Sequence, residues 1–431
     1  MKRAAERYFS FDELGTSWAR EIGAGFTTFL TMAYIIFVNP SILADAGMPA
    51  AAVMTATCLS AGFASILMGG IARYPVAMAP GMGLNAYFTY GVVKGMGVTW
   101  QVALGAVFLS GVLFLVLTAF GVRRWIVESI PKPLYAAVAA GIGLFIALIG
   151  MKNAGIVVAS PATALTLGNL RTPAVALAAV TLLVTAALLV RGVRAAILIG
   201  VVGAVIAANV LGLTQGGGAA VAAPLWMQLD VGGALRLGLV EIVFAFLFVD
   251  LFDNLGTLLA VAQRAKLIGA DGSIPRINRI LAADSVATMA GSLLGTSTVV
   301  SYIESAAGVA AGGRSGVVAI VTGLLFLASV FVTPLAGAIP AAATAPALIL
   351  VGVLMMSHAA AIDWDDLSHA IPAFLTMAAI PYTFSIANGL SLGFISYAAL
   401  KLLTGRGREV SPFVYCLAAV LLARFYYLGS G

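Results

Sequence analysis

Two aspartates, Asp250 and Asp253, interrupt an otherwise apolar stretch that reads EIVFAFLFVDLFDNLGT over residues 241–257. The stretch has the character of a membrane-spanning helix, and a carboxylate at the centre of such a helix costs about 2.5–3.5 kcal/mol to insert. A residue that costly indicates binding or proton transfer, with packing against a polar partner as the alternative. A spacing of three places both carboxylates on one helix face. They are therefore the first candidates for a site inside a membrane.

Two short apolar stretches carry further polar residues. RYPVAMAPGMGLNAYFTYGVV contains Asn85, and LLGTSTVVSYIESAAGVAAGG contains Glu304. Proline in the first and β-branched residues in the second disfavour a helix, so we expect an extended segment and then a half-helix in each. The positive end of each half-helix would face a central cavity, beside Asp250. The alternatives are a bridge between two helices for Asn85 and a helix cap for Glu304.

Membrane-spanning helices must position these residues. The chain has 431 residues, of which 61% are hydrophobic and 9% charged, and its mean hydropathy is +1.07. This composition excludes a soluble globular protein, and the chain lacks the alternating segments of a β-barrel. We therefore predict an all-α polytopic membrane protein of about 14 transmembrane spans, with the lipid bilayer as its surroundings.

The apolar stretches form two series of seven, and the third stretch of each series is the short, interrupted one. An odd number of spans makes two repeats inverted, and paired broken helices in inverted repeats indicate the substrate site of a transporter. We expect a cytoplasmic N-terminal segment (1–21), a first repeat (22–213), a linker (214–236), a second repeat (237–404) and a C-terminal apolar helix (405–431). The sequence leaves open whether residues 412–428 cross the membrane.

The distribution of charge predicts orientation. Most Lys and Arg residues fall in loops on the side of the N-terminus, which predicts a cytoplasmic N-terminus in the plasma (inner) membrane. The net charge of +6 then reflects topology and gives no support for a nucleic-acid partner. The stretch HAAAIDWDDLSH carries His358 and His369, and we interpret it as a solvated loop whose aspartate starts a helix rather than as a metal site.

The expected cavity has three carboxylates and one amide, with no Lys or Arg at the same depth. Such a site favours a substrate with several N–H donors and repels anions. No nucleotide-hydrolase, metalloprotease or nucleophile-elbow motif lies in a usable loop, so we expect no enzyme, no metal and no cofactor. Accumulation would then need an ion gradient, with H⁺ as the simplest coupling ion. We expect Asp284, in the stretch 277–294, to be structural.

Five stretches resemble a known family and cover nearly the whole chain: REIGAGFTTFLTMAYIIFVNPSILADAG, APGMGLNAYFTYGVV, FLFVDLFDNLGTLLAVAQRA, GTSTVVSYIESAAGVAAGGRSG and AIPAAATAPALILVGVLMM. In them the chain resembles the AzgA-like branch of the nucleobase-cation symporter-2 (nucleobase:ascorbate) transporters. The resemblance implies import of adenine, guanine and hypoxanthine by proton symport. It also implies alternating access of a core domain (spans 1–4 and 8–11) against a gate domain (spans 5–7 and 12–14), and a homodimer is possible by the same likeness.

The resemblance also implies roles for individual residues. Those expected to bind the purine are Asp250, Glu304 and Asn85, with Tyr302 and Ile303 flanking it through backbone contacts. Proton coupling is expected at Asp253 or Asp250. The uracil and xanthine branches carry a histidine where this chain has Asn254, which argues against those substrates and leaves the proton carrier open.

Three other functions are considered. An anion transporter of the same architecture, for sulfate or bicarbonate, is disfavoured by central carboxylates without a basic partner. A channel would conduct without accumulation. An intramembrane enzyme is disfavoured because its two aspartates would come from separate helices, whereas Asp250 and Asp253 share one.

Overall fold

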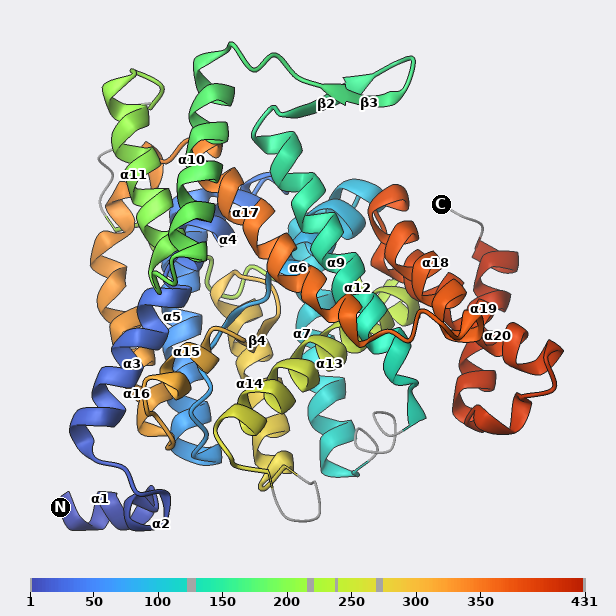
Figure 1. Cartoon of the computed structure of the whole chain (residues 1–431), viewed down its shortest axis with the longest axis horizontal. Coiled ribbons are helices and arrows are strands. Elements are labelled where there is room, and N and C mark those ends of the chain that lie inside the picture. The colour runs from blue at the N-terminus through green and yellow to red at the C-terminus, as the bar shows by residue number, and fades with distance from the viewer. Residues whose placement is uncertain (1, 122–128, 215–220, 237–238, 269–273, 429–431) are drawn as a thin grey trace.

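The computed structural model describes residues 2–121, 129–214, 221–236, 239–268 and 274–428. The chain folds as a bundle of helices with two short antiparallel strand pairs (Figure 1). Among the described residues, seven helices are long and apolar enough to cross a membrane. The predicted all-α polytopic fold is therefore confirmed, while the number of 14 spans stays a prediction.

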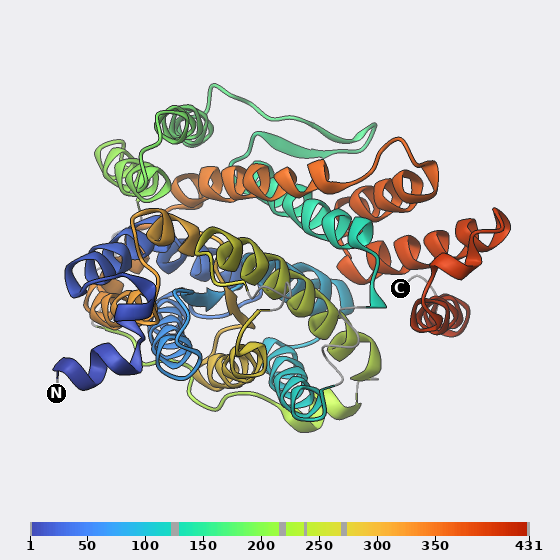
Figure 2. The same ribbon diagram turned by 60° about the horizontal axis from the view of Figure 1, so that its bottom comes forward.

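Most helices pack in two groups, each of which takes elements from both halves of the chain. The core group comprises α3 (Trp18–Met32), α4 (Ile35–Ala44), α5 (Ala50–Leu67), η1 (Met68–Ala72), α6 (Met82–Ala86), η2 (Tyr87–Lys94), α7 (Trp100–Ala119), α13 (Leu239–Arg264), α14 (Ile277–Leu294), α15 (Ser305–Ala310) and α16 (Val317–Ala328). The gate group comprises α9 (Lys132–Asn153), α10 (Pro173–Val190), α11 (Ala196–Val210), α17 (Ala341–Met356), α18 (Leu367–Thr383) and α19 (Ile386–Leu403). Figure 2 shows the gate group as a layer lying over the core group. We name the groups after the domains expected from the sequence, and their relative movement stays a prediction.

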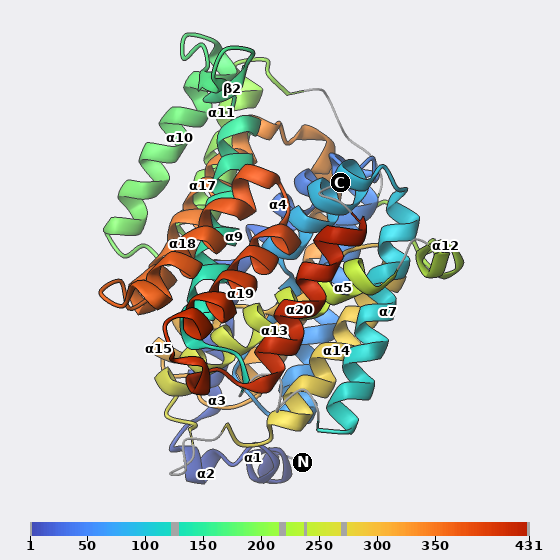
Figure 3. The same ribbon diagram turned by 90° about the vertical axis from the view of Figure 1, so that its right-hand side faces the viewer.

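The remaining elements lie at the ends and edges of the bundle. Helices α1 (Lys2–Tyr8) and α2 (Phe11–Leu14) lie at one end, and the hairpin of β2 (Val157–Ser160) and β3 (Ala164–Leu167) lies at the other (Figure 1). The 3-10 segments η3 (Ser329–Ala338), η4 (Ser357–Ala361) and η5 (Gly407–Glu409) connect helices. The predicted C-terminal helix is α20 (Pro412–Leu428), which packs beside α19 (Figure 3).

The expected linker contains one helix, α12 (Val231–Arg236), which packs against α7. The side chain of Asp230 accepts a hydrogen bond from the N–H of Gly233 at 2.8 Å, which satisfies a free donor at the start of this helix. A single aspartate therefore starts a helix in a segment whose glycines indicated only a connection.

Helices α5 and α16 touch backbone to backbone through glycines. A Cβ atom at Gly323 would lie 2.7 Å from the carbonyl oxygen of Gly62. Gly69 of η1 and Gly316, just before α16, approach even more closely, because a Cβ atom at Gly69 would lie 2.3 Å from the carbonyl oxygen of Gly316. Close approach through small residues is a common way to pack membrane helices, because lipid supplies little hydrophobic force between them. This contact joins the first repeat to the second within the core group.

The two interrupted spans meet inside the core group. Strand β1 (Met78–Pro80) pairs antiparallel with β4 (Val299–Ser301), and both strands are buried. Hydrogen bonds from the N–H of Gly81 to the carbonyl of Thr298 (2.9 Å) and from the N–H of Tyr302 to the carbonyl of Ala77 (3.0 Å) extend the pairing. Each extended segment satisfies the backbone of the other, as a non-helical segment at membrane depth requires. The predicted extended segments are confirmed.

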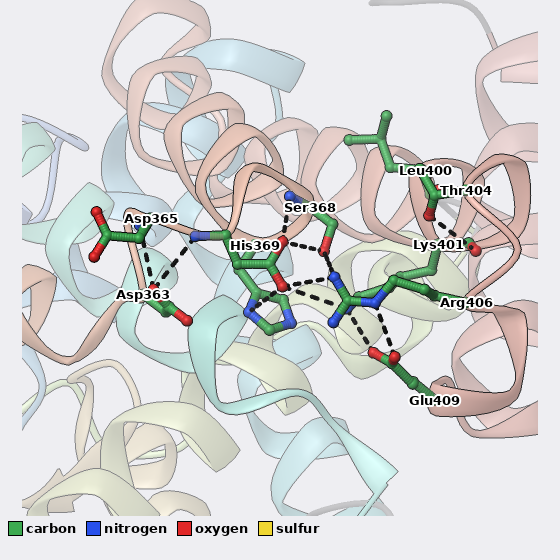
Figure 4. A network of polar contacts seen from close by, with 10 residues as sticks. Asp363, Asp365, Ser368, His369, Leu400, Lys401, Thr404, Arg406 and Glu409 are labelled. Atoms are coloured by element: carbon green, nitrogen blue, oxygen red, sulfur yellow. Dashed lines mark hydrogen bonds and ion pairs between the residues drawn. The ribbon is translucent and has the colours of Figure 1, made fainter.

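A polar network fastens the start of α18 to the end of α19 (Figure 4). Asp366 accepts hydrogen bonds from the N–H of Ser368 (2.9 Å) and from Arg406 (2.8 Å), so an aspartate starts the helix as predicted. Glu409 accepts from Arg406 and from the buried Lys401, both at 2.8 Å. Arg406 and then Lys401 lower the pKa of Glu409 to about 2, and Ser368 followed by Arg406 holds the pKa of Asp366 below its usual range.

His369, at the same place, stacks on Tyr397 with ring centroids 6.0 Å apart. Within the described part of the chain, no group of three His, Cys, Asp or Glu residues could hold a metal ion.

Candidate functional site

Asn254 is the centre of a buried polar cluster on α13. Its amide nitrogen donates to Asp250, one turn earlier, at 3.0 Å and also to Asp284 of α14. Its amide oxygen accepts from the backbone N–H of Ser301 in β4 at 2.8 Å. Asp250, Asn254 and Asp284 are completely buried. One amide therefore connects two carboxylates to the strand of the second interrupted span.

Asp284, which the sequence led us to expect as a structural residue, lies in this cluster. Its carboxylate shares the Asn254 amide with Asp250, and its structural role stays a prediction. The proximity depends on the packing of α13 beside α14, which spacing along the chain does not reveal. Asp253 also lies on α13, but its side chain is outside the described residues.

Glu304 lies one residue before α15, the half-helix of the second interrupted span. Its Oε1 accepts a hydrogen bond from the hydroxyl of Tyr34 at 2.5 Å, and Tyr34 is completely buried between α3 and α4. Within the described residues, the carboxylate caps no N–H of α15. The helix-cap alternative therefore does not describe the geometry, and Glu304 faces the first repeat.

Asn85 is buried on α6, the half-helix of the first interrupted span. Its amide nitrogen donates to Oδ1 of Asn39 at 2.5 Å, and its amide oxygen accepts from the hydroxyl of Ser297. It thus links α4 to the segment before β4. This bridging contact is present, while contact with a substrate stays a prediction.

Tyr302 and Ile303 differ in their surroundings. Tyr302 is buried, its hydroxyl donates to the carbonyl of Pro80 at 2.5 Å, and its backbone N–H is used in the strand pairing. Ile303 is 42% exposed. The expected backbone contacts of both residues with a ligand stay a prediction.

The site is therefore a set of buried acceptors and amides around the paired strands β1 and β4. Residues 19–392 match the family model Xan_ur_permease, described as the Permease family. The chain belongs to this family. It is 45% identical to Adenine permease AdeP of Escherichia coli (strain K12), over 99% of this chain and 96% of that protein. It is also 45% identical to Guanine/hypoxanthine permease PbuG of Bacillus subtilis (strain 168), over 98% of this chain and 99% of that protein.

These matches confirm the resemblance to the AzgA-like branch, and they place this permease among transporters rather than enzymes. The fold has solved counterparts as well. The transmembrane domain of a cyanobacterium bicarbonate transporter, BicA, superimposes with a TM-score of 0.67 over 88% of this chain and 98% of that chain, at 17% identity. At that identity the likeness concerns the fold alone.

Aromatic and aliphatic side chains border the site in the permease. The ring of Tyr87, which follows α6, meets Phe246 of α13 edge to face with centroids 5.1 Å apart, one turn before Asp250. On the side of the gate group, a Cβ atom at Gly83 would lie 2.5 Å from Cγ2 of Ile142 in α9. The half-helix α6 is therefore in direct contact with the gate group.

Sequence reasoning missed residues that hydrogen-bond the candidate site residues of this permease, namely Tyr34 beside Glu304 and Asn39 beside Asn85. Nothing in the sequence indicated a role for Tyr34, because tyrosine is common where an apolar stretch meets the membrane interface. Asn39 gave a usable signal, since it is the single asparagine in the apolar stretch 22–43 and stands next to a proline. An amide costs less to bury than a carboxylate, so this signal was weaker than that of Asp250.

Proposed function

We propose that this permease imports purine nucleobases, namely adenine, guanine or hypoxanthine, by proton symport. The observation that carries the proposal is a pair of carboxylates beside the paired interrupted spans. Asp250 is completely buried and is linked to β4 through Asn254, and Glu304 is half-buried at the start of α15. Two relatives that match nearly the whole chain at 45% identity are named adenine permease and guanine/hypoxanthine permease, which supports the same substrates here.

The chemistry of the site suits a neutral base. Purines present ring N–H and amino donors, and Asp250 and Glu304 are acceptors when ionised. The flat ring could be covered by an aromatic face, for which Tyr87 and Phe88 are the nearest candidates beyond α6. Carboxylates repel anions, so we favour a nucleobase over the sulfate or bicarbonate alternative even though the fold also occurs in a bicarbonate transporter.

We propose that the coupling proton is held within the cluster around Asn254. The candidates are Asp250, Asp253 and, because it shares the same amide, Asp284. A bound proton reduces the charge of the buried carboxylates, and its release on the opposite side returns the site to its starting state. Moving one elementary charge through 100 mV supplies about 2.3 kcal/mol, which is enough for roughly 50-fold accumulation of a neutral purine.

Transport then requires the paired strands and half-helices of the core group to move against the gate group, opening the same site alternately to each side. We infer a cytoplasmic N-terminus and a plasma-membrane location from the basic loops. The homodimer is a further prediction, which the mass of the purified protein in detergent would test.

The test is uptake of radiolabelled adenine, guanine and hypoxanthine in cells that lack their own purine carriers. Asp250→Asn and Glu304→Gln keep the side-chain shape and remove the charge, and we expect both to lose uptake. Asp365→Asn is the matched control, because Asp365 is exposed and its side chain bonds no other described residue. Absence of saturable purine uptake by the unmodified protein would contradict the proposal. Accumulation that persists with an uncoupler would contradict the proton coupling alone.

A further inference from the structure

Five completely buried polar side chains form a continuous set of hydrogen bonds between the first repeat and the segment before β4. They are Thr57, Asn39, Thr296, Asn85 and Ser297. They come from α5, α4, α6 and the residues that lead into β4. The helices α4, α5 and α6 belong to the core group, and Thr296 and Ser297 directly precede β4, so the set lies beside the paired strands β1 and β4.

Thr57 determines which groups in this set donate and which accept. Its hydroxyl donates to the carbonyl of Val53, one turn earlier in α5, at 2.7 Å. A hydroxyl has one proton, so the oxygen of Thr57 can then only accept from other groups. Asn39 therefore turns its NH₂ group toward Thr57, at 2.7 Å, and toward Thr296, at 2.9 Å.

The orientation passes from one amide to the next. With both N–H groups of Asn39 used, its Oδ1 faces Asn85 and accepts from the Asn85 amide nitrogen at 2.5 Å. The oxygen of Asn85 then faces Ser297 and accepts from its hydroxyl. Such a network determines which end of an asparagine amide is the oxygen and which is the nitrogen. Asn85 is left with one N–H that no described residue accepts, while its oxygen is engaged.

We propose that Thr57 and Asn39 are positioning residues that hold the Asn85 amide so that it offers an N–H, and not its oxygen, to the substrate. The inference rests on the proposed function, in which Asn85 contacts the purine. The atom it recognises is then a hydrogen-bond acceptor of the base, such as an unprotonated ring nitrogen or an exocyclic oxygen. The carboxylates of the proposed site, Asp250 and Glu304, accept hydrogen bonds from N–H groups of the base. Asn85 would donate one, so the site could bind both the donors and the acceptors of a purine.

Reversal of the Asn85 amide would add another acceptor to a site already rich in acceptors. Reversal also requires Thr57 to withdraw its hydroxyl from Val53 and donate to Asn39 instead. Thr57 is therefore the residue on which the polarity depends, although it lies two side chains away from the substrate.

Thr57→Val tests this, because valine keeps the shape of threonine and removes the hydroxyl. Thr57→Ser is the matched control, since serine retains the hydroxyl. We expect Thr57→Val to raise the KM for purine uptake by about five- to tenfold, the effect of losing one well-oriented hydrogen bond, with kcat little changed. We expect Thr57→Ser to remain within about twofold of the unmodified protein. Thr57→Ala is the second variant if the valine variant is not recovered in the membrane.

Two further measurements separate positioning from simple packing. In an Asn85→Ala background, Thr57→Val should have no further effect on KM, because its target is gone. Purines in which one ring nitrogen is replaced by C–H remove one acceptor at a time. At least one such analogue should bind more weakly than its parent purine to the unmodified protein. The same analogue and its parent should bind equally well to the Asn85→Ala variant, and likewise to the Thr57→Val variant.

Equal KM values for Thr57→Val and Thr57→Ser would overturn the inference, and so would an undiminished effect of Thr57→Val without Asn85. These results differ from failure of the proposed function, in which the unmodified protein takes up no purine at all.

Discussion

The contact between Gly83 of α6 and Ile142 of α9 leaves no room for a side chain at position 83, which predicts that Gly83→Ala impairs transport. A Cβ atom at Gly83 would lie 2.5 Å from Cγ2 of Ile142, whereas carbon atoms in contact normally lie about 3.5–4.0 Å apart. Isoleucine is branched at Cβ and stiff at χ1, so Cγ2 cannot swing aside easily. Gly83→Ala therefore requires α6 and α9 to separate by about 1 Å or more.

The cost follows from measurements on overpacked interiors. One added methylene in a packed contact costs about 1–3 kcal/mol. If the core group moves against the gate group, only states that contain this contact bear the cost, so the balance between states shifts by about 5- to 150-fold. We expect Gly83→Ala to lower the maximal rate of purine uptake at least about fivefold while the amount of protein in the membrane is unchanged.

The assay is labelled purine uptake normalised to the amount of protein in the membrane. Gly70→Ala is the matched control, because no described atom lies within 4 Å of the position a Cβ would take there. Ile142→Ala removes the opposing Cγ2, so the double variant Gly83→Ala/Ile142→Ala should recover uptake. If Gly83→Ala transports as fast as Gly70→Ala, or if Ile142→Ala fails to restore it, the reasoning about this contact is refuted.

Three further outcomes follow from the packing and the charges. Gly323→Ala should lower the free energy of unfolding by about 1–3 kcal/mol through its clash with the Gly62 carbonyl, measured as a lower melting temperature in detergent than that of Gly70→Ala. The pKa of Glu409 is about 2 in the folded protein against an ordinary 4.5. Its stabilising effect is therefore complete above pH 4.5 and is lost as the pH falls toward 2. Over that pH range the melting temperature should drop less in Glu409→Gln than in the unmodified protein. Glu21→Gln should lower the free energy of unfolding by about 1–3 kcal/mol, because the buried carboxylate accepts from two backbone N–H groups and an amide nitrogen would face one of them; unchanged melting would count against this role.

The sequence predicted the interrupted spans because their causes are local. Proline before Asn85 and the β-branched residues before Glu304 act within a few positions, and the structure has strands at both places. The pairing of β1 with β4 was not predicted. It depends on bringing two repeats together, and neither extended segment contains information about its partner.

The same distinction explains the candidate site. The insertion cost of a carboxylate identified Asp250 from composition alone, and the structure buries it completely. That cost also applied to Asp284, but its link to Asp250 runs through Asn254, a residue on a different helix from Asp284 that donates to both aspartates. Asn39 was missed for a related reason, because its importance lies in the direction of its hydrogen bonds, which appears only when Thr57 and Asn85 are in place.

The pairing of β1 with β4 has a consequence for how the protein is made. Ser297 and Asn85, which flank the paired strands, are 212 residues apart in the chain, so the ribosome completes β1 long before its partner exists. Until then the extended backbone of the first repeat lacks its hydrogen bonds, and each unsatisfied group costs several kcal/mol in hydrocarbon. The first repeat therefore cannot reach its final form at membrane depth by itself. During biogenesis this segment must therefore stay hydrated or sheltered by other protein until the second repeat is inserted and supplies β4.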